Sequence, residues 1–146
     1  MKKRVGIIIL VLLLLILAGG GAAFYYYYSK YINIDAIYPG MTIQGMSVGG
    51  MTQEEAKAKV QEYIDKVSQE TVTLQVKKKE STFDLSDIGL KCTNMDVVEK
   101  AYDFGKTGNV FKRVIEVRKL EKEGMDFPLI FSVDKAETRK VVKKKA

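Results

Sequence analysis

The sequence contains no histidine, no tryptophan and only one cysteine, Cys92, among its 146 residues. Without histidine the chain cannot assemble a Ser-His-Asp triad, a Cys-His dyad or a histidine-containing zinc site. A single cysteine cannot form a disulfide within the chain. We therefore expect no catalytic residues, no bound metal and no cofactor. The composition, 47% apolar and 29% charged, also excludes a disordered or collagen-like chain.

Excess positive charge is confined to the two ends of the sequence. The formal net charge is +6, but eight of the 24 basic residues lie at positions 2–4 and 139–145. Between residues 5 and 138 there are 16 basic and 18 acidic residues, so this part of the chain has a slightly negative net charge. The lysines at 77–79 have no interleaved aromatic residues that could stack on bases, so they indicate a solvated turn. We expect no nucleic-acid partner.

Residues 5–23 form a run of 19 uncharged, mostly apolar residues, including eleven consecutive Val, Ile and Leu residues at 7–17. As a helix, this run would be about 28 Å long, which nearly matches a bilayer core. Five aromatic residues follow at 24–28, as in the aromatic belt of a membrane interface. The sequence therefore predicts a cytoplasmic tip at 1–4, a transmembrane helix at 5–23, an aromatic juxtamembrane stalk at 24–36 and an exterior domain at 37–146.

The charges that flank this run predict its orientation. Lys2, Lys3 and Arg4 precede the run, whereas only Lys30 lies close behind it. The positive-inside rule then places the N-terminus in the cytoplasm and the domain outside the plasma membrane. A cleaved signal peptide remains the alternative, because small residues at 21–23 suit signal peptidase. In either case the remainder is exported.

The exterior part has the pattern of an α+β domain, a small antiparallel sheet packed by several helices. Thr52 with Glu55 and Asp134 with Glu137 are capping boxes, and Asn94 and Asn109 can each cap a further helix. The predicted elements are a short extended segment at 41–43, helices at 52–69, 95–104 and 110–122, a β-hairpin at 71–77 and 81–85, a strand at 127–132 and a helix from 134.

The last predicted helix has an apolar face that the C-terminal residue leaves unfinished, which favours a sequence that continues beyond it over a basic tail. Val110, Val114, Val117 and Leu120 are predicted to face inward from the helix at 110–122.

Two acidic pairs and one lysine motif have structural explanations. Glu54 and Glu55 suit the start of a helix, and Asp84 and Asp87 bracket a turn without the ordered oxygen ligands of a calcium loop. Residues 105–107 superficially resemble the end of a phosphate loop, but its first glycine is missing and a helix precedes the motif. We therefore expect no nucleotide partner.

Two glycine-containing motifs carry a family resemblance. Residues 37–56 read Ile-Tyr-Pro-Gly-Met-Thr-Ile-Gln-Gly-Met-Ser-Val-Gly-Gly-Met-Thr-Gln-Glu-Glu-Ala, and residues 101–109 read Ala-Tyr-Asp-Phe-Gly-Lys-Thr-Gly-Asn. Together with Arg113, they resemble the peptidoglycan-binding domain found in front of L,D-transpeptidases and in VanW-like proteins. Lys106 stands where arginine is commoner in that family. The resemblance covers residues 37–135, and the family's N-terminal membrane anchor agrees with the apolar run.

The resemblance implies a bacterial envelope domain that binds peptidoglycan or spaces a downstream module from it. The family's catalytic half, with its histidine and Gly-Cys motif, is missing, and Cys92 does not fit that motif. The chain is then a noncatalytic wall-binding module or spacer. The alternative is the N-terminal part of an L,D-transpeptidase, which crosslinks the cell wall, or of a VanW-like protein.

The residues expected to contact peptidoglycan are Tyr102, Lys106, Asn109 and Arg113. A phenol, an amide and two cations suit sugar hydroxyls and peptide carboxylates. A purely structural interpretation stays open, since Gly105 can end one helix and Asn109 can cap the next.

Overall fold

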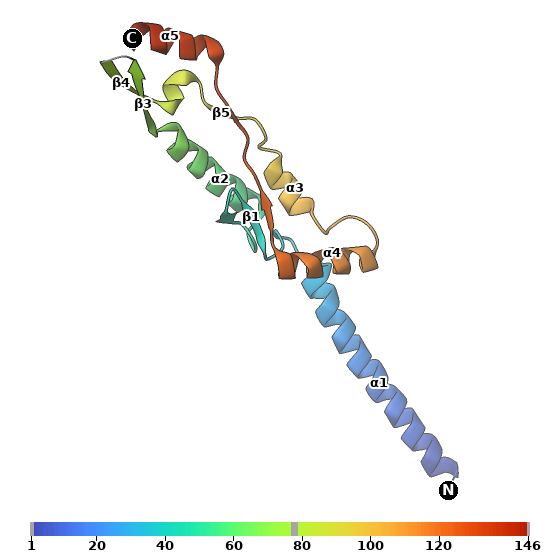
Figure 1. Ribbon diagram of the computed structural model, residues 1–146. Helices are drawn as coiled ribbons and strands as arrows, with labels where there is room; N and C mark the ends of the chain where they lie inside the picture. The colour runs from blue at the N-terminus through green and yellow to red at the C-terminus, as the bar shows by residue number, and fades with distance from the viewer. Residues whose placement is uncertain (1, 77–78, 146) are drawn as a thin grey trace.

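The computed structural model describes residues 2–76 and 79–145, which form five α-helices, one short 3-10 helix and three small sheets (Figure 1). The predicted α+β class is confirmed. In chain order the elements are α1 (Lys2–Tyr31), β1 (Met41–Ile43), β2 (Met46–Ser47), α2 (Gln53–Ser68), β3 (Thr71–Val76), β4 (Lys79–Asp84), η1 (Leu85–Ile88), β5 (Lys91–Cys92), α3 (Val97–Asp103), α4 (Val110–Glu123), β6 (Met125–Phe127), β7 (Phe131–Ser132) and α5 (Lys135–Lys145).

Helix α1 projects from the rest of the molecule as a single rod (Figure 1). Its large apolar residues between positions 5 and 17 have exposed fractions of 49–72%, so no part of the chain that the structure describes covers them. The helix does not stop after the apolar run but continues through the aromatic residues to Tyr31. Within the described residues it is the one helix long and apolar enough to cross a membrane.

The core lies where the end of α1 meets the domain. Tyr38 is fully buried, and its hydroxyl donates a hydrogen bond to the Tyr31 carbonyl at 2.7 Å. This bond ties the segment after α1 to the last turn of the helix. The other fully buried large side chains come from the 37–48 region and from α2, α3 and α4: Ile37, Met41, Ile43, Val48, Val60, Val98, Val117 and Leu120.

Strand β1 lies at the centre of the main sheet, whose order is β2-β1-β6. It pairs with β2 as an antiparallel hairpin and with β6 in parallel, with Met41 opposite Met125. The β3–β4 hairpin is antiparallel, as predicted, and so is the β5–β7 pair. The structure differs from the predicted single antiparallel sheet in having three small sheets, of which the main one includes a parallel pair. Of the predicted lysine turn, residues 77 and 78 lie outside the described residues.

Two predicted helix starts are confirmed in detail. Thr52 Oγ1 accepts the Glu55 N–H at 3.3 Å, and the Glu55 carboxylate accepts the Thr52 N–H at 2.9 Å. Asn109 Oδ1 accepts the Lys112 N–H at 2.8 Å and so caps α4. Both signals are local, because each cap bonds a backbone group three residues away.

Three local predictions are corrected. Asn94 does not cap α3, which begins at Val97; its carboxamide instead accepts the Ile130 N–H at 2.7 Å and donates to the Pro128 carbonyl at 2.9 Å. The strand predicted at 127–132 is two short strands, because residues 128–130 leave the first sheet: Pro128 and Ile130 bond to Asn94, and the Leu129 N–H donates to the Gln44 side chain.

Val110 is the third correction. It is 50% exposed rather than inward-facing, since the first turn of α4 extends past the core toward α1. The predicted cap of α5 is half formed: Asp134 Oδ1 accepts the N–H groups of Ala136 and Glu137, but the Asp134 N–H donates to the Ile88 carbonyl instead of to Glu137.

Asp126 fastens the β1–β2 turn to β6. Its Oδ1 accepts hydrogen bonds from the Thr42 hydroxyl at 2.6 Å and from the Gly45 N–H at 2.8 Å. The Thr42 hydroxyl, and then the Gly45 N–H, lower the pKa of the Asp126 carboxyl below its ordinary value of 3.8. The ionised carboxylate therefore stabilises the folded state.

We expect Asp126→Asn to lower the free energy of unfolding by about 1 kcal/mol at pH 6, because charge-assisted hydrogen bonds weaken. A lowered folded-state pKa gives stabilisation that is present above the ordinary value of 3.8 and lost as the pH falls through the lowered value. The difference between wild type and variant should then shrink below pH 3.8 in denaturant titrations. Glu99→Gln on α3 is the control. A difference independent of pH would contradict this role.

Candidate functional site

The turn between α3 and α4, residues 104–109, is built by two glycines and one cap. Gly105 has a φ of +68° and reverses the chain after α3, and Gly108 has a φ of +95° just before Asn109. Asn109 then caps α4 through Lys112. The predicted site residue Asn109 therefore has a structural task in the turn.

Arg113 also has a structural task. Its Nε donates to the Gly105 carbonyl at 2.8 Å, and its Nη2 donates to the Ile32 carbonyl at 2.9 Å. The half-buried guanidinium thus joins the turn to the segment that follows α1. Both bonds are charge-assisted, and they use two of the five N–H donors of the guanidinium to hold the turn.

The structure brings the other two predicted residues, Tyr102 and Lys106, together. The Tyr102 hydroxyl donates a hydrogen bond to the carboxylate of Asp35, which raises the pKa of the Tyr102 phenol. The Lys106 Nζ lies 3.1 Å from the centre of the Tyr102 ring, in a cation–π contact. We name Asp35, Tyr102 and Lys106 the Tyr102 cluster.

The ammonium of Lys106 is shielded from water and has no hydrogen-bond partner among the described residues. Loss of water lowers the pKa of Lys106, while the carboxylates of Asp35 and Asp103 oppose that shift. An ammonium donor without an acceptor can bind a carboxylate or a carbonyl oxygen.

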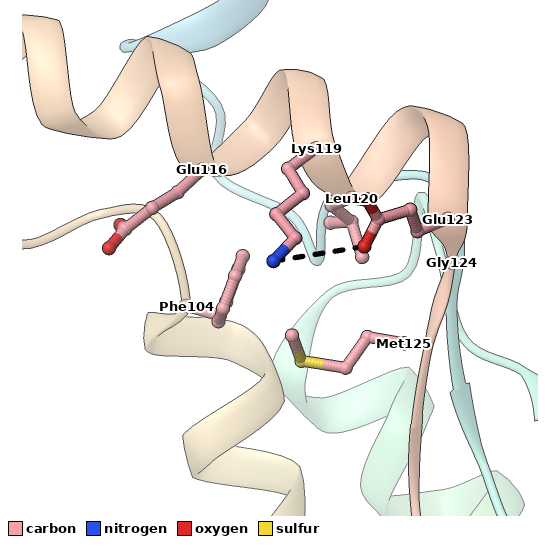
Figure 2. Close-up of a pocket in the computed structure, with 7 residues that line it drawn as sticks. All are labelled: Phe104, Glu116, Lys119, Leu120, Glu123, Gly124 and Met125. Atoms are coloured by element: carbon pink, nitrogen blue, oxygen red, sulfur yellow. Dashed lines mark ion pairs between the residues drawn. The ribbon is translucent and has the colours of Figure 1, made fainter.

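A pocket of about 230 Å³ adjoins the same turn, between the end of α3, one side of α4 and the start of β6. Figure 2 shows Phe104 and Met125 pointing into the space beneath Lys119. We call it the Phe104 pocket. Its volume is slightly below the roughly 300–1,000 Å³ of sites for drug-sized ligands, so it suits one sugar ring or one amino-acid side chain. The residues that line it are Phe104, Glu116, Lys119, Leu120, Glu123, Gly124 and Met125.

The pocket has an apolar floor and a charged rim. Phe104, Leu120 and Met125 supply the floor. On the rim, the Lys119 Nζ lies 3.8 Å from a Glu123 carboxylate oxygen, in an ion pair whose side chains are 71% and 64% exposed (Figure 2). Such exposed pairs contribute only about 0–1 kcal/mol, so a ligand can exchange them at little cost.

The sequence pattern did not single out the pocket. Glu116, Lys119 and Glu123 follow the i,i+3 and i,i+4 spacing of an ordinary solvated helix face. The one sequence feature that could have indicated the pocket is Phe104, the aromatic residue inside the Ala-Tyr-x-x-Gly motif. Its side chain is half-buried at the start of the turn. Elsewhere in the described chain, no three His, Cys, Asp or Glu side chains gather as metal ligands.

Comparison with known proteins identifies one similarity. Residues 81–146 match the model of the family described as "Putative peptidoglycan binding domain". No curated protein and no solved structure matches the chain. The predicted resemblance to a peptidoglycan-binding domain is thereby confirmed for the part of the chain that contains residues 101–109, whereas the motif at 37–56 lies outside the match. The match does not distinguish an L,D-transpeptidase from a VanW-like protein. Every residue that lines the Phe104 pocket lies within it.

Proposed function

We propose that this chain is a single-pass, membrane-anchored protein of the bacterial envelope whose exterior domain binds peptidoglycan through the Phe104 pocket. The observation that carries the proposal is that all seven pocket residues fall inside the segment similar to a peptidoglycan-binding family. The turn that positions them is also the turn in which the family motif ends.

The chemistry of the pocket fits a polymer of N-acetylated sugars joined to short peptides. The Phe104 ring and the Met125 thioether offer an apolar surface for the face of a sugar ring or for a methyl group. Carboxylates on the rim, Glu116 and Glu123, can accept hydrogen bonds from sugar hydroxyls, and Lys119 can donate to a peptide carboxylate.

The Tyr102 cluster supports a second contact in the same ligand. Lys106 offers an ammonium with no hydrogen-bond acceptor in the described part of the chain, next to the aromatic ring of Tyr102. A stem-peptide carboxylate would supply the missing acceptor once the Lys106 side chain turns outward from the Tyr102 ring. Asn109 and Arg113 then act in the proposal by holding the turn, not by touching the ligand.

The apolar helix supports the location. The proposed orientation places residues 2–4 in the cytoplasm, residues 5–23 in the bilayer and the domain from residue 37 outside, where the wall lies. The exposed, uncovered apolar surface of α1 is what a bilayer would bury.

Removal of both rim carboxylates tests wall binding. We expect Glu116→Gln/Glu123→Gln to reduce retention of the detergent-solubilised full chain on purified sacculi by about tenfold, because two charged acceptors for sugar hydroxyls are lost. Co-sedimentation across a range of sacculus concentrations measures the effect. The matched control is Glu62→Gln/Glu70→Gln, which changes the charge equally and breaks the similarly exposed Lys66–Glu62 pair on α2.

Equal retention of the two double variants would contradict the assignment of the pocket. If the wild type itself sediments no more than a control domain of similar charge, the exterior domain is a spacer rather than a wall-binding module.

The motif at 37–56 supports a further, compatible proposal. In the family that this motif resembles, such a domain precedes the catalytic part of an L,D-transpeptidase or belongs to a VanW-like protein. The parent protein would then use the domain to position that part near the wall. A reading frame continuing into a Ser-x-Gly-Cys-like segment would support the transpeptidase.

A further inference from the structure

One stripe of α4 is apolar and cationic at the same time. Phe111 and Ile115 are 83% and 68% exposed, and with Arg118 and Lys122 they follow at intervals of four, three and four residues. That spacing places all four side chains on one side of the helix. We call them the α4 outer stripe.

The acidic residues of α4 project from other sides of the helix. Glu121 faces α1, where its carboxylate lies 3.1 Å from the Lys30 Nζ. Glu116 and Glu123 lie on the side of the Phe104 pocket. The α4 outer stripe itself carries large exposed apolar side chains and two cations, the pattern of a helix that lies on an anionic membrane surface. Glu123 borders the stripe in a shallow hollow that it shares with Ile115, Arg118 and Lys122.

The α4 outer stripe is continuous with the aromatic end of α1. Arg118 lies 6.0 Å from the centre of the Tyr27 ring. A small apolar cavity of about 130 Å³ separates the two helices, and its lining is shared between them: Phe24, Tyr27, Tyr28, Ile32, Val110 and Val114. The surface that begins on the aromatic belt thus continues along α4.

The position of this contact along α1 sets its depth. Residues 24–28 follow directly after the apolar run, and at 1.5 Å per residue they occupy roughly the first 7 Å beyond it. The headgroup layer on each side of a bilayer is about 5–8 Å thick. When residues 5–23 span the hydrocarbon core, the part of α4 that packs on residues 24–28 lies at the level of the lipid headgroups. The Lys30–Glu121 ion pair, roughly 10 Å beyond the core, lies just above that level and joins the same two helices.

We propose that α4 is a second membrane contact, in which Phe111 and Ile115 enter the headgroup boundary of the outer leaflet while Arg118 and Lys122 bind lipid phosphates. The inference rests on the proposed membrane anchor and adds to it. A helix that lies on the bilayer holds the domain in one orientation, with the β3–β4 hairpin and α5 at the end farthest from α1 (Figure 1). The Phe104 pocket opens on a different side of α4.

The absence of tryptophan permits a direct test. Single-tryptophan variants of the full chain are reconstituted in vesicles of phosphatidylcholine and phosphatidylglycerol, with and without brominated acyl chains that quench nearby indoles. Phe111→Trp probes the α4 outer stripe, Leu14→Trp probes the anchor, and Ile130→Trp, at an exposed position in the 128–130 segment, is the matched control.

We expect about a twofold loss of Phe111→Trp emission in brominated vesicles, together with a blue shift relative to Ile130→Trp, which should show no quenching. A quenched Leu14→Trp with an unquenched Phe111→Trp would overturn the inference and leave the anchor intact. A blue-shifted but unquenched Phe111→Trp would also overturn it, since protein rather than lipid would then cover the stripe. If Leu14→Trp is also unquenched, the anchor itself fails.

Charge removal tests the phosphate contacts separately. Arg118→Gln/Lys122→Gln, added to Phe111→Trp, should reduce quenching in anionic vesicles and have little effect in purely zwitterionic ones. The control pair Lys57→Gln/Lys135→Gln changes the charge equally on α2 and α5. Equal quenching with both pairs in anionic vesicles would refute the role of Arg118 and Lys122.

Discussion

Gly105→Ala is expected to destabilise the exterior domain by about 3 kcal/mol. An alanine at a φ of +68° costs about 1–2 kcal/mol in backbone strain. Its Cβ would also lie 2.9 Å from Val117 Cγ2 and 3.1 Å from Tyr38 Cε2. Both neighbours are fully buried, so neither can move without disturbing the core, and overpacking adds about 1–3 kcal/mol. Denaturant unfolding of the full chain in micelles, followed by circular dichroism, measures the loss.

Gly108→Ala in the same turn is the matched control. Its φ of +95° is equally unfavourable for alanine, but the nearest atom to the new Cβ is the flexible Lys112 Cδ at 3.4 Å. We expect a loss of about 1–2 kcal/mol from backbone strain alone. Equal losses at the two positions would show that the turn is not packed against the core as described.

Two lysines inside the apolar run are expected to release the chain from membranes. The eleven Val, Ile and Leu residues at 7–17 contribute about −3 to −7 kcal/mol of insertion free energy, whereas each central lysine costs about 3 kcal/mol. Leu12→Lys/Leu14→Lys therefore cancels most or all of the favourable insertion energy. Alkaline carbonate extraction of membranes from expressing cells should move most of the variant, but not the wild type, into the soluble fraction.

Ile130→Lys/Val133→Lys is the control for added charge, because both residues are exposed and distant in sequence from α1. It should remain in the membrane fraction. Membrane retention of the Leu12→Lys/Leu14→Lys variant would mean that α1 is not the anchor.

Sequence patterns predicted what depends on neighbours along the chain. The long apolar helix, the capping box of Thr52 and Glu55, the Asn109 cap and the β3–β4 hairpin all rest on contacts between residues that are close in sequence. The parallel pairing of β1 with β6 joins segments more than 80 residues apart, so the sequence around either strand does not indicate it. Asn94 was assigned to a local cap for the same reason, although it bonds residues 128 and 130.

In the candidate site too, the sequence indicated what depends on neighbouring residues and missed what depends on residues distant in sequence. The motif drew attention to Tyr102 and Lys106, which the structure places in contact. The Phe104 pocket exists only because α4 and the start of β6 fold back on the end of α3, so its charged rim looked like an ordinary solvated helix face in the sequence. Met125, on its floor, could not be assigned to a pocket without that arrangement.

Met125 also offers the most direct test of the central claim, that the Phe104 pocket binds peptidoglycan. The full chain, labelled with carbon-13 at its methionine methyl groups and held in micelles, is titrated with soluble fragments from muramidase-treated wall. The Met125 methyl resonance should shift in a saturable manner while those of Met41 and Met51 stay in place. Saturable shifts at other methionines with Met125 unmoved, or no shift at any methionine, would contradict the account.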